Sequence, residues 1–167
     1  MKRPPLGFSL IETMIVLVIV TILMSLLSLN LSFLQAGYAQ HELSLFHSRL
    51  HALQQTAIVT GKSQSMAIVP GENSYYWDGQ PYKLPKTLRF GIKQGIRGPP
   101  SHPSHEITNP VTFSENTIIF HPDGIIKPGT LYLLDHRQQL YALSCGVGHV
   151  SFLRKYRYDG AWKLIDT

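Results

Sequence analysis

The feature that most constrains this chain is a long apolar segment that begins around a single carboxylate. Residues 7–12 have the sequence Gly-Phe-Ser-Leu-Ile-Glu, and the next charged residue after Glu12 is Glu42. The 22 residues from 8 to 29 would extend about 33 Å as a helix, close to the thickness of the hydrocarbon core of a bilayer. We therefore expect residues 8–29 to form a transmembrane helix.

The charges beside this segment predict its orientation. Lys2 and Arg3 precede the apolar residues, which favours a single-pass protein with a cytoplasmic N-terminus and an exported C-terminal domain. A secretory signal would place small residues after the apolar segment as a cleavage site. Residues 28–31, Ser-Leu-Asn-Leu, do not fit such a site, so we expect the helix to be retained.

Residues 7–12, followed by Met-Ile-Val-Leu-Val-Ile-Val at 14–20, resemble the class III signal of type IV pilins and type II secretion pseudopilins. In that family a prepilin peptidase cuts after the glycine and methylates the new N-terminal amine. The resemblance implies a leader of residues 1–7, cleavage between Gly7 and Phe8, and N-methylation of Phe8. It also implies a role for Glu12 in filament assembly.

The chemistry of Glu12 points to function without this resemblance. An ionisable group inside an apolar span is costly, so it is a candidate functional residue. After cleavage, the amine of Phe8 would lie one helical turn away and could neutralise the carboxylate, within one subunit or between neighbours. Alternatively, Glu12 lies at the level of the lipid headgroups, where the helix dipole favours an acid.

The helical pattern continues beyond the apolar segment. A stripe of apolar residues recurs at steps of three and four, with polar residues between them, which predicts that residues 30–60 form an amphipathic continuation of the same helix. Gly61 supplies a stop. The stripe consists of Ala36, Ala39, Leu43, Phe46, Leu50, Leu53 and Ala57.

Residues 61–167 have the alternating pattern of short strands, so we expect an α+β, pilin-like fold: a long N-terminal helix packed on a mainly antiparallel β-sheet domain. Residues 94–110 are rich in glycine and proline and predict a loop too poor in apolar groups to pack. The last third has an apolar strand at 117–120, a Pro-Asp-Gly turn at 122–124, strands at 130–134 and 140–144 and a glycine turn at 146–148. This order resembles the GspH/FimT pseudopilin family. Strands are expected at 65–69, 74–77, 82–84, 88–92, 117–120, 130–134, 140–144, 150–158 and 161–165.

The C-terminal strands predict a hairpin with a basic and aromatic surface. Asp159-Gly160 is typical of a two-residue turn, which would place Tyr158 opposite Ala161 and Arg157 opposite Trp162. In this register one face would carry four candidate DNA contacts, of the composition that binds nucleic acids: Arg154, Tyr156, Tyr158 and Lys163. Alternatively, the hairpin is a solvated edge in which Arg157 lies over Trp162.

Composition limits other functions. The net charge of +5 becomes +3 when Lys2 and Arg3 leave with the leader, and this mild excess does not by itself indicate nucleic-acid binding. The single cysteine, Cys145, excludes an internal disulfide framework and is expected at a buried strand end.

We expect no metal, no cofactor and no enzymatic activity. His47 and His51 have the spacing of a metal pair, but no acidic residue or cysteine accompanies them, so surface or boundary positions are expected. His102 and His105 are expected to face solvent. Cys145 and His149 could be a nucleophile and a base, but no third group is identifiable to orient them.

The sequence therefore predicts a structural protein of the inner membrane. The resemblance favours a minor pseudopilin of a type II secretion system, whose partners are other pseudopilins, the prepilin peptidase and the membrane. A second hypothesis is a minor pilin of a type IV pilus or DNA-uptake filament that itself contacts DNA. A plain single-span membrane protein is the third.

Overall fold

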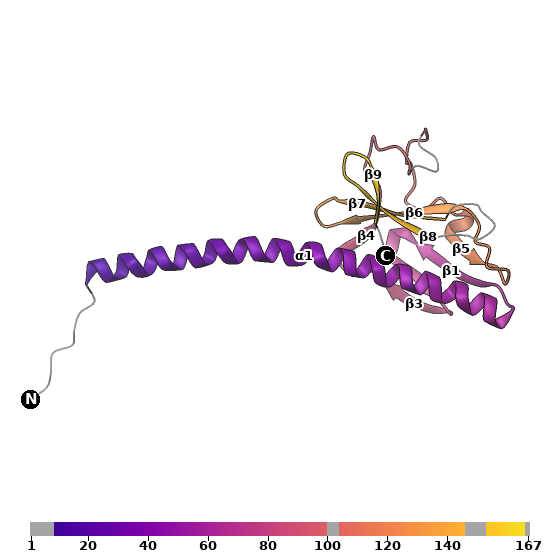
Figure 1. Cartoon of the computed structure of the whole chain (residues 1–167), viewed down its shortest axis with the longest axis horizontal. Helices are drawn as coiled ribbons and strands as arrows, with labels where there is room; N and C mark the ends of the chain where they lie inside the picture. Colours follow the sequence, from indigo (N-terminus) through magenta and orange to yellow (C-terminus); the bar gives the residue numbers. More distant parts are fainter. Residues whose placement is uncertain (1–8, 100–103, 146–152, 166–167) are drawn as a thin grey trace, which may run out of the picture. The chain divides into compact units, whose positions relative to one another are not determined.

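The computed structural model describes residues 9–99, 104–145 and 153–165, with the side chains of residues 27–38 excepted. The chain divides into two compact units, Met1–Tyr38 and Ala39–Thr167. The first contains the start of helix α1 (Leu10–Thr60). The second contains the rest of that helix and the strands labelled in Figure 1.

In the first unit, the side chains of α1 that the structure describes, at residues 10–26, are all exposed. Large apolar side chains of residues 10–26 are exposed, from 43% at Val20 to 78% at Leu10. The hydroxyl of Thr13 donates a hydrogen bond to the Leu10 carbonyl, and that of Thr21 donates one to the Val18 carbonyl, so both polar groups are paired within the helix. At the other end of α1, Gly61 adopts a φ of +65°, a conformation that glycine tolerates, and the helix ends as predicted.

The strands of the second unit form two antiparallel sheets. The first sheet has the order β3-β2-β1-β5, from β1 (Gln64–Val69), β2 (Ser74–Trp77), β3 (Gln80–Lys83) and β5 (Thr117–Phe120). The short strand β3 contains Pro81 and lies at the edge, where a missing N–H donor is tolerated. The turn after β5 is closed by the N–H of Gly124 donating to the carbonyl of His121 (2.9 Å).

The second sheet has the order β4-β6-β7-β8-β9, in which β6 to β9 are a simple meander. Its strands are β4 (Leu88–Phe90), β6 (Gly129–Asp135), β7 (Leu140–Cys145), β8 (Leu153–Tyr158) and β9 (Trp162–Ile165). The expected mainly antiparallel β-sheet domain therefore consists of two sheets.

The main core lies between α1 and both sheets. All described members of the predicted stripe are buried, from Ala39 and Leu43 to Ala57, while the side chain of Ala36 lies outside the described residues. The five from Leu43 to Ala57 pack in one cluster with side chains of both sheets, so the α+β fold with a helix on antiparallel sheets is confirmed (Figure 1). The sheet residues of this cluster include Met66, Tyr75, Ile118, Phe120, Leu131, Leu133, Tyr141 and Leu143.

A smaller core covers the opposite face of the second sheet, and it corrects the expectation for residues 94–110. Ile96 and Ile107 from this segment are only 6% exposed and pack with Tyr132, Leu134 and other residues of β6 and β7. Backbone bonds join the two halves of the segment, including one from Ile107 N–H to the Ile96 carbonyl (3.2 Å). The described parts of the segment therefore pack despite their glycines and prolines.

The hairpin of β8 and β9 has a different register from the predicted one. Tyr158 lies opposite Trp162, and Arg157 lies opposite Lys163. The turn contains three residues, closed by the Asp159 N–H donating to the Ala161 carbonyl (2.9 Å). Because side chains alternate along a strand, a shift of one residue in β9 moves each of its side chains to the other face.

Candidate functional site

Ser9 and Glu12 form a capping box at the start of α1. Ser9 immediately precedes the first helical residue, and its hydroxyl accepts a hydrogen bond from the Ile11 N–H (3.3 Å). The Glu12 carboxylate reaches back and accepts one from the Ser9 N–H (3.4 Å). This reciprocal pattern satisfies donors that the first turn of a helix leaves without partners.

The sequence analysis missed the role of Ser9, although the Ser-x-x-Glu spacing at residues 9–12 is a known sign of this cap. The predicted cleavage residues, Gly7 and Phe8, lie outside the described residues. The structure therefore gives Glu12 a local role in starting the helix, on a side chain that is exposed. The negative carboxylate also lies at the end of the helix where the dipole favours an anion.

The apolar residues that follow Glu12 are exposed on every side of the helix. This holds for large side chains at 14–20 and 22–24, and for Leu26. Among the described residues, no helix is long and apolar enough to qualify as a membrane span.

The β8–β9 hairpin carries the four candidate DNA contacts, but not on one face. One face of β8 contains every second residue: Arg154, Tyr156 and Tyr158. Trp162 lies on the same face, because it is paired with Tyr158 in the observed register. Lys163 lies on the other face, where its ammonium group forms an ion pair with Asp159 (2.9 Å). This hydrogen bond and the positive charge of Lys163 lower the pKa of the Asp159 carboxyl.

A groove of about 620 Å³ lies between this hairpin and the segment that contains Arg97. The Trp162 indole N–H donates to the Arg97 carbonyl (2.9 Å), and its ring meets that of Tyr158 edge to face at 5.3 Å. These two contacts orient the Trp162 ring at the edge of the groove. The remaining lining residues are small: Gly95, Gly98, Gly160 and Ala161.

His47 is buried, which corrects the expectation of a surface or boundary position. It is 5% exposed, and its Nε2 atom donates to the Leu153 carbonyl of β8 (3.1 Å), because a carbonyl can only accept. Burial lowers the pKa of His47, and the nearby charges of His51 and Lys155 lower it further, while the hydrogen bond opposes this change.

The other residues considered for metal or catalytic chemistry do not form a site in the described parts of the chain. His51 and His105 are exposed, while His102 and His149 lie outside the described residues. No group of three side chains able to hold a metal ion occurs among the described residues. Cys145 is buried at the end of β7, as predicted, with its sulfur 3.8 Å from the Ile126 carbonyl.

Comparison with known proteins identifies the N-terminal segment. Residues 3–28 match the family model of the prokaryotic N-terminal methylation motif. No curated protein and no solved structure matches the chain. The motif covers residues 7–12, which end at Glu12, and the exposed apolar residues that follow. It indicates processing of the kind that type IV pilins and pseudopilins undergo. It supports a type IV pilin-like chain that is a structural subunit.

Proposed function

We propose that this chain is a minor pseudopilin, a structural subunit of the pseudopilus of a type II secretion system. A prepilin peptidase cleaves it between Gly7 and Phe8 and methylates the amine of Phe8. The mature chain is held in the inner membrane by residues 8–29, with its N-terminus in the cytoplasm and residues 61–167 exported. Its partners are other pseudopilins, which contact it first through the apolar part of α1.

The observation that carries this proposal is the exposed apolar surface of α1 beginning beside one carboxylate. An apolar helix that buries no face in its own chain is stable in lipid or against other helices. Glu12 is costly in either environment unless a positive group neutralises it, and the freed amine of Phe8 would supply that charge. The strand and turn order from β5 to β8 supports a pseudopilin of the GspH/FimT type.

The capping box allows the charge of Glu12 to be tested separately from its effect on the helix. Glu12→Gln keeps a side chain that can accept the Ser9 N–H, but removes the negative charge. Glu12→Ala removes both. If the charge recruits a neighbouring amine, we expect both variants to be cleaved and membrane-bound but absent from purified pseudopili. Ser9→Ala weakens only the cap by about 1 kcal/mol and should still assemble.

The measurements are the intact mass of the membrane-extracted chain, the composition of pseudopili and the secretion of the system's substrate. The mass should show loss of residues 1–7 and gain of one methyl group. A mass that retains the leader would contradict cleavage. Normal assembly of Glu12→Gln would show that capping, not charge, is what the position needs. Normal secretion in a strain that lacks the chain would exclude the pseudopilin role.

A second candidate function is DNA contact by a minor pilin, through the face of the β8–β9 hairpin that contains Arg154 and three aromatic side chains. Arg154, Tyr156, Tyr158 and Trp162 share one face, beside the groove at Arg97. Aromatic rings beside an arginine are suited to stacking the bases of a single strand. Lys163 lies on the opposite face and serves as a matched control.

Binding of a fluorescent single-stranded oligonucleotide to the full chain in neutral detergent would test this function. We expect Arg154→Gln and Trp162→Ala each to weaken binding by about tenfold, since one stacked base contributes about 1–3 kcal/mol. Lys163→Gln should bind as the parent does. Absence of binding at low ionic strength, or equal losses in all three variants, would contradict specific DNA contact by this face.

A further inference from the structure

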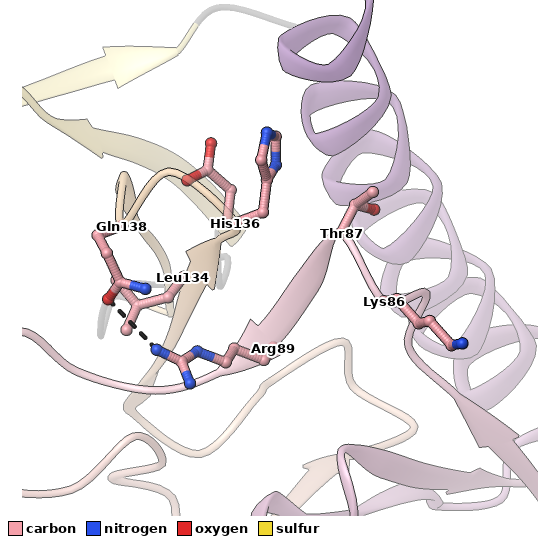
Figure 2. Close-up of a pocket in the computed structure, with 7 residues that line it drawn as sticks. Lys86, Thr87, Arg89, Leu134, His136 and Gln138 are labelled. Atoms are coloured by element: carbon pink, nitrogen blue, oxygen red, sulfur yellow. Dashed lines mark hydrogen bonds between the residues drawn. The ribbon is translucent and has the colours of Figure 1, made fainter. Parts of the chain in front are cut away.

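A second hollow lies on the second compact unit, Ala39–Thr167, which we call the sheet unit. It is located where the start of β4 meets the turn between β6 and β7. It has a volume of about 250 Å³. Figure 2 shows the side chains that line it, with a dashed line for the hydrogen bond between Arg89 and Gln138. The lining residues are Lys86, Thr87, Arg89, Leu134, Asp135, His136 and Gln138.

Hydrogen bonds within this region hold its backbone in place. The Asp135 carboxylate accepts from the N–H groups of Arg137 and Gln139, both at 2.8 Å. The His136 N–H donates to the Thr87 carbonyl (3.2 Å), which joins the turn to the segment before β4. Among the lining side chains, Leu134 and Asp135 are buried and Thr87 is partly buried. The other four are exposed: Lys86, Arg89, His136 and Gln138.

The polar side chains of the hollow are mainly hydrogen-bond donors. Arg89 donates to the Oε1 atom of Gln138 (3.3 Å), so the Gln138 amide presents its nitrogen, a donor, to other groups. Lys86 adds a second positive charge. Within the described parts of the chain, the one ion pair is Lys163 with Asp159, so neither Lys86 nor Arg89 is neutralised there by a carboxylate.

Asp135 is the one carboxylate that lines the hollow, and its Oδ1 atom is already occupied by two backbone donors. With Lys86 and Arg89 positive and Asp135 negative, the lining has a formal charge of about +1. A concave site with a positive charge and additional neutral donors attracts anions. A phosphoryl group offers more acceptor oxygens than the two of a carboxylate, and the planar guanidinium of arginine matches its geometry.

We propose that this hollow binds a phosphoryl group, from free phosphate or from the headgroup of a phospholipid. Arg89 and the Gln138 amide are its main contacts. Figure 2 shows the Lys86 ammonium directed away from Arg89, so Lys86 contributes by turning its flexible stem toward the bound anion, and its share is smaller. The proposal does not depend on the function of the N-terminal segment.

The test is a titration of the full, isotope-labelled chain in neutral detergent micelles with inorganic phosphate. Sodium chloride is reduced as phosphate is added, so that ionic strength stays constant. We expect saturating shifts of the backbone amide resonances of Thr87, His136 and Gln138. Arg89→Gln should raise the Kd about tenfold, as expected for loss of a charged donor, and Lys86→Gln less. Lys62→Gln, on an exposed lysine of another segment, should leave the Kd unchanged.

Two further titrations decide the class and the source of the anion. Glutarate replaces phosphate in one, and tighter binding of glutarate would overturn the phosphoryl assignment in favour of a carboxylate. In the other, micelles contain phosphatidylglycerol in phosphate-free buffer, and shifts of the same three resonances would identify a lipid headgroup as the source. No saturating shift with either phosphate source, or equal weakening by Lys62→Gln, would overturn the proposal.

Discussion

His47 lies on α1 with its ring bonded to a carbonyl of β8, and its surroundings make the stability of the sheet unit depend on pH. Burial, together with the positive charges of His51 and Lys155, lowers its pKa in the folded chain below the ordinary value of 6.5. The unfolded chain therefore binds a proton at this residue at a higher pH than the folded chain does. The free energy of unfolding must then fall as the pH falls below about 6.5.

We expect this dependence to weaken in His47→Gln, which keeps a donor for the Leu153 carbonyl but does not titrate. The measurement is urea unfolding at pH 7.5 and at several lower values, followed by the fluorescence of Trp77 and Trp162, which both lie in the sheet unit. His41→Gln, an exposed histidine on the same helix, is the control for the remaining histidines. If the parent and His47→Gln lose stability equally between these pH values, the predicted linkage is wrong.

The sequence located Glu12 but explained only part of its environment. Its isolation in an apolar segment identified it as a candidate functional residue. Its hydrogen bond to Ser9, three residues before it, could have been predicted from the Ser-x-x-Glu spacing of a capping box. Burial of His47 could not be predicted in the same way. The carbonyl that accepts its hydrogen bond belongs to Leu153, 106 residues away, and no local pattern reveals such a partner.

Among the elements, α1 was the most predictable, because its stripe repeats a helical spacing over 22 residues from Ala36 to Ala57. The β8–β9 register was wrong for a physical reason. Asp-Gly favours a two-residue turn, but a three-residue turn lets Trp162 pack near Tyr132 and donate to the Arg97 carbonyl. Contacts with residues distant in the sequence outweighed the local preference of the turn.

The stripe also predicts which apolar residues of α1 stabilise the sheet unit. Leu50 is fully buried between the helix and the sheets, whereas Leu45 on the same helix is 37% exposed. We expect Leu50→Ala to lower the free energy of unfolding by about 3 kcal/mol, through lost apolar contact and a residual cavity. Leu45→Ala, the matched control, should cost less than about 1 kcal/mol. Urea unfolding followed by tryptophan fluorescence measures both, and similar losses would contradict the assigned packing.

For the whole molecule, the sequence predicted the α+β class and the short antiparallel strands, but not their division into two sheets. Both sheets share the same apolar surface of α1, and alternation within single strands contains no information about which sheet a strand joins. The packing of Ile96 and Ile107 was missed for a related reason. Two apolar residues among glycines and prolines are enough to anchor the segment, because the outer face of the second sheet is itself apolar.

The position of the helix stripe also decides where this chain can be shortened. The compact sheet unit begins at Ala39, so its N-terminal boundary falls inside α1 and not at the glycine that ends the helix. A fragment starting at residue 61 would leave the inner faces of both sheets open to water, because Leu43, Phe46, Leu50 and Leu53 fill the space between them. A soluble fragment for crystallography should therefore start before residue 39 and keep the distal half of the helix.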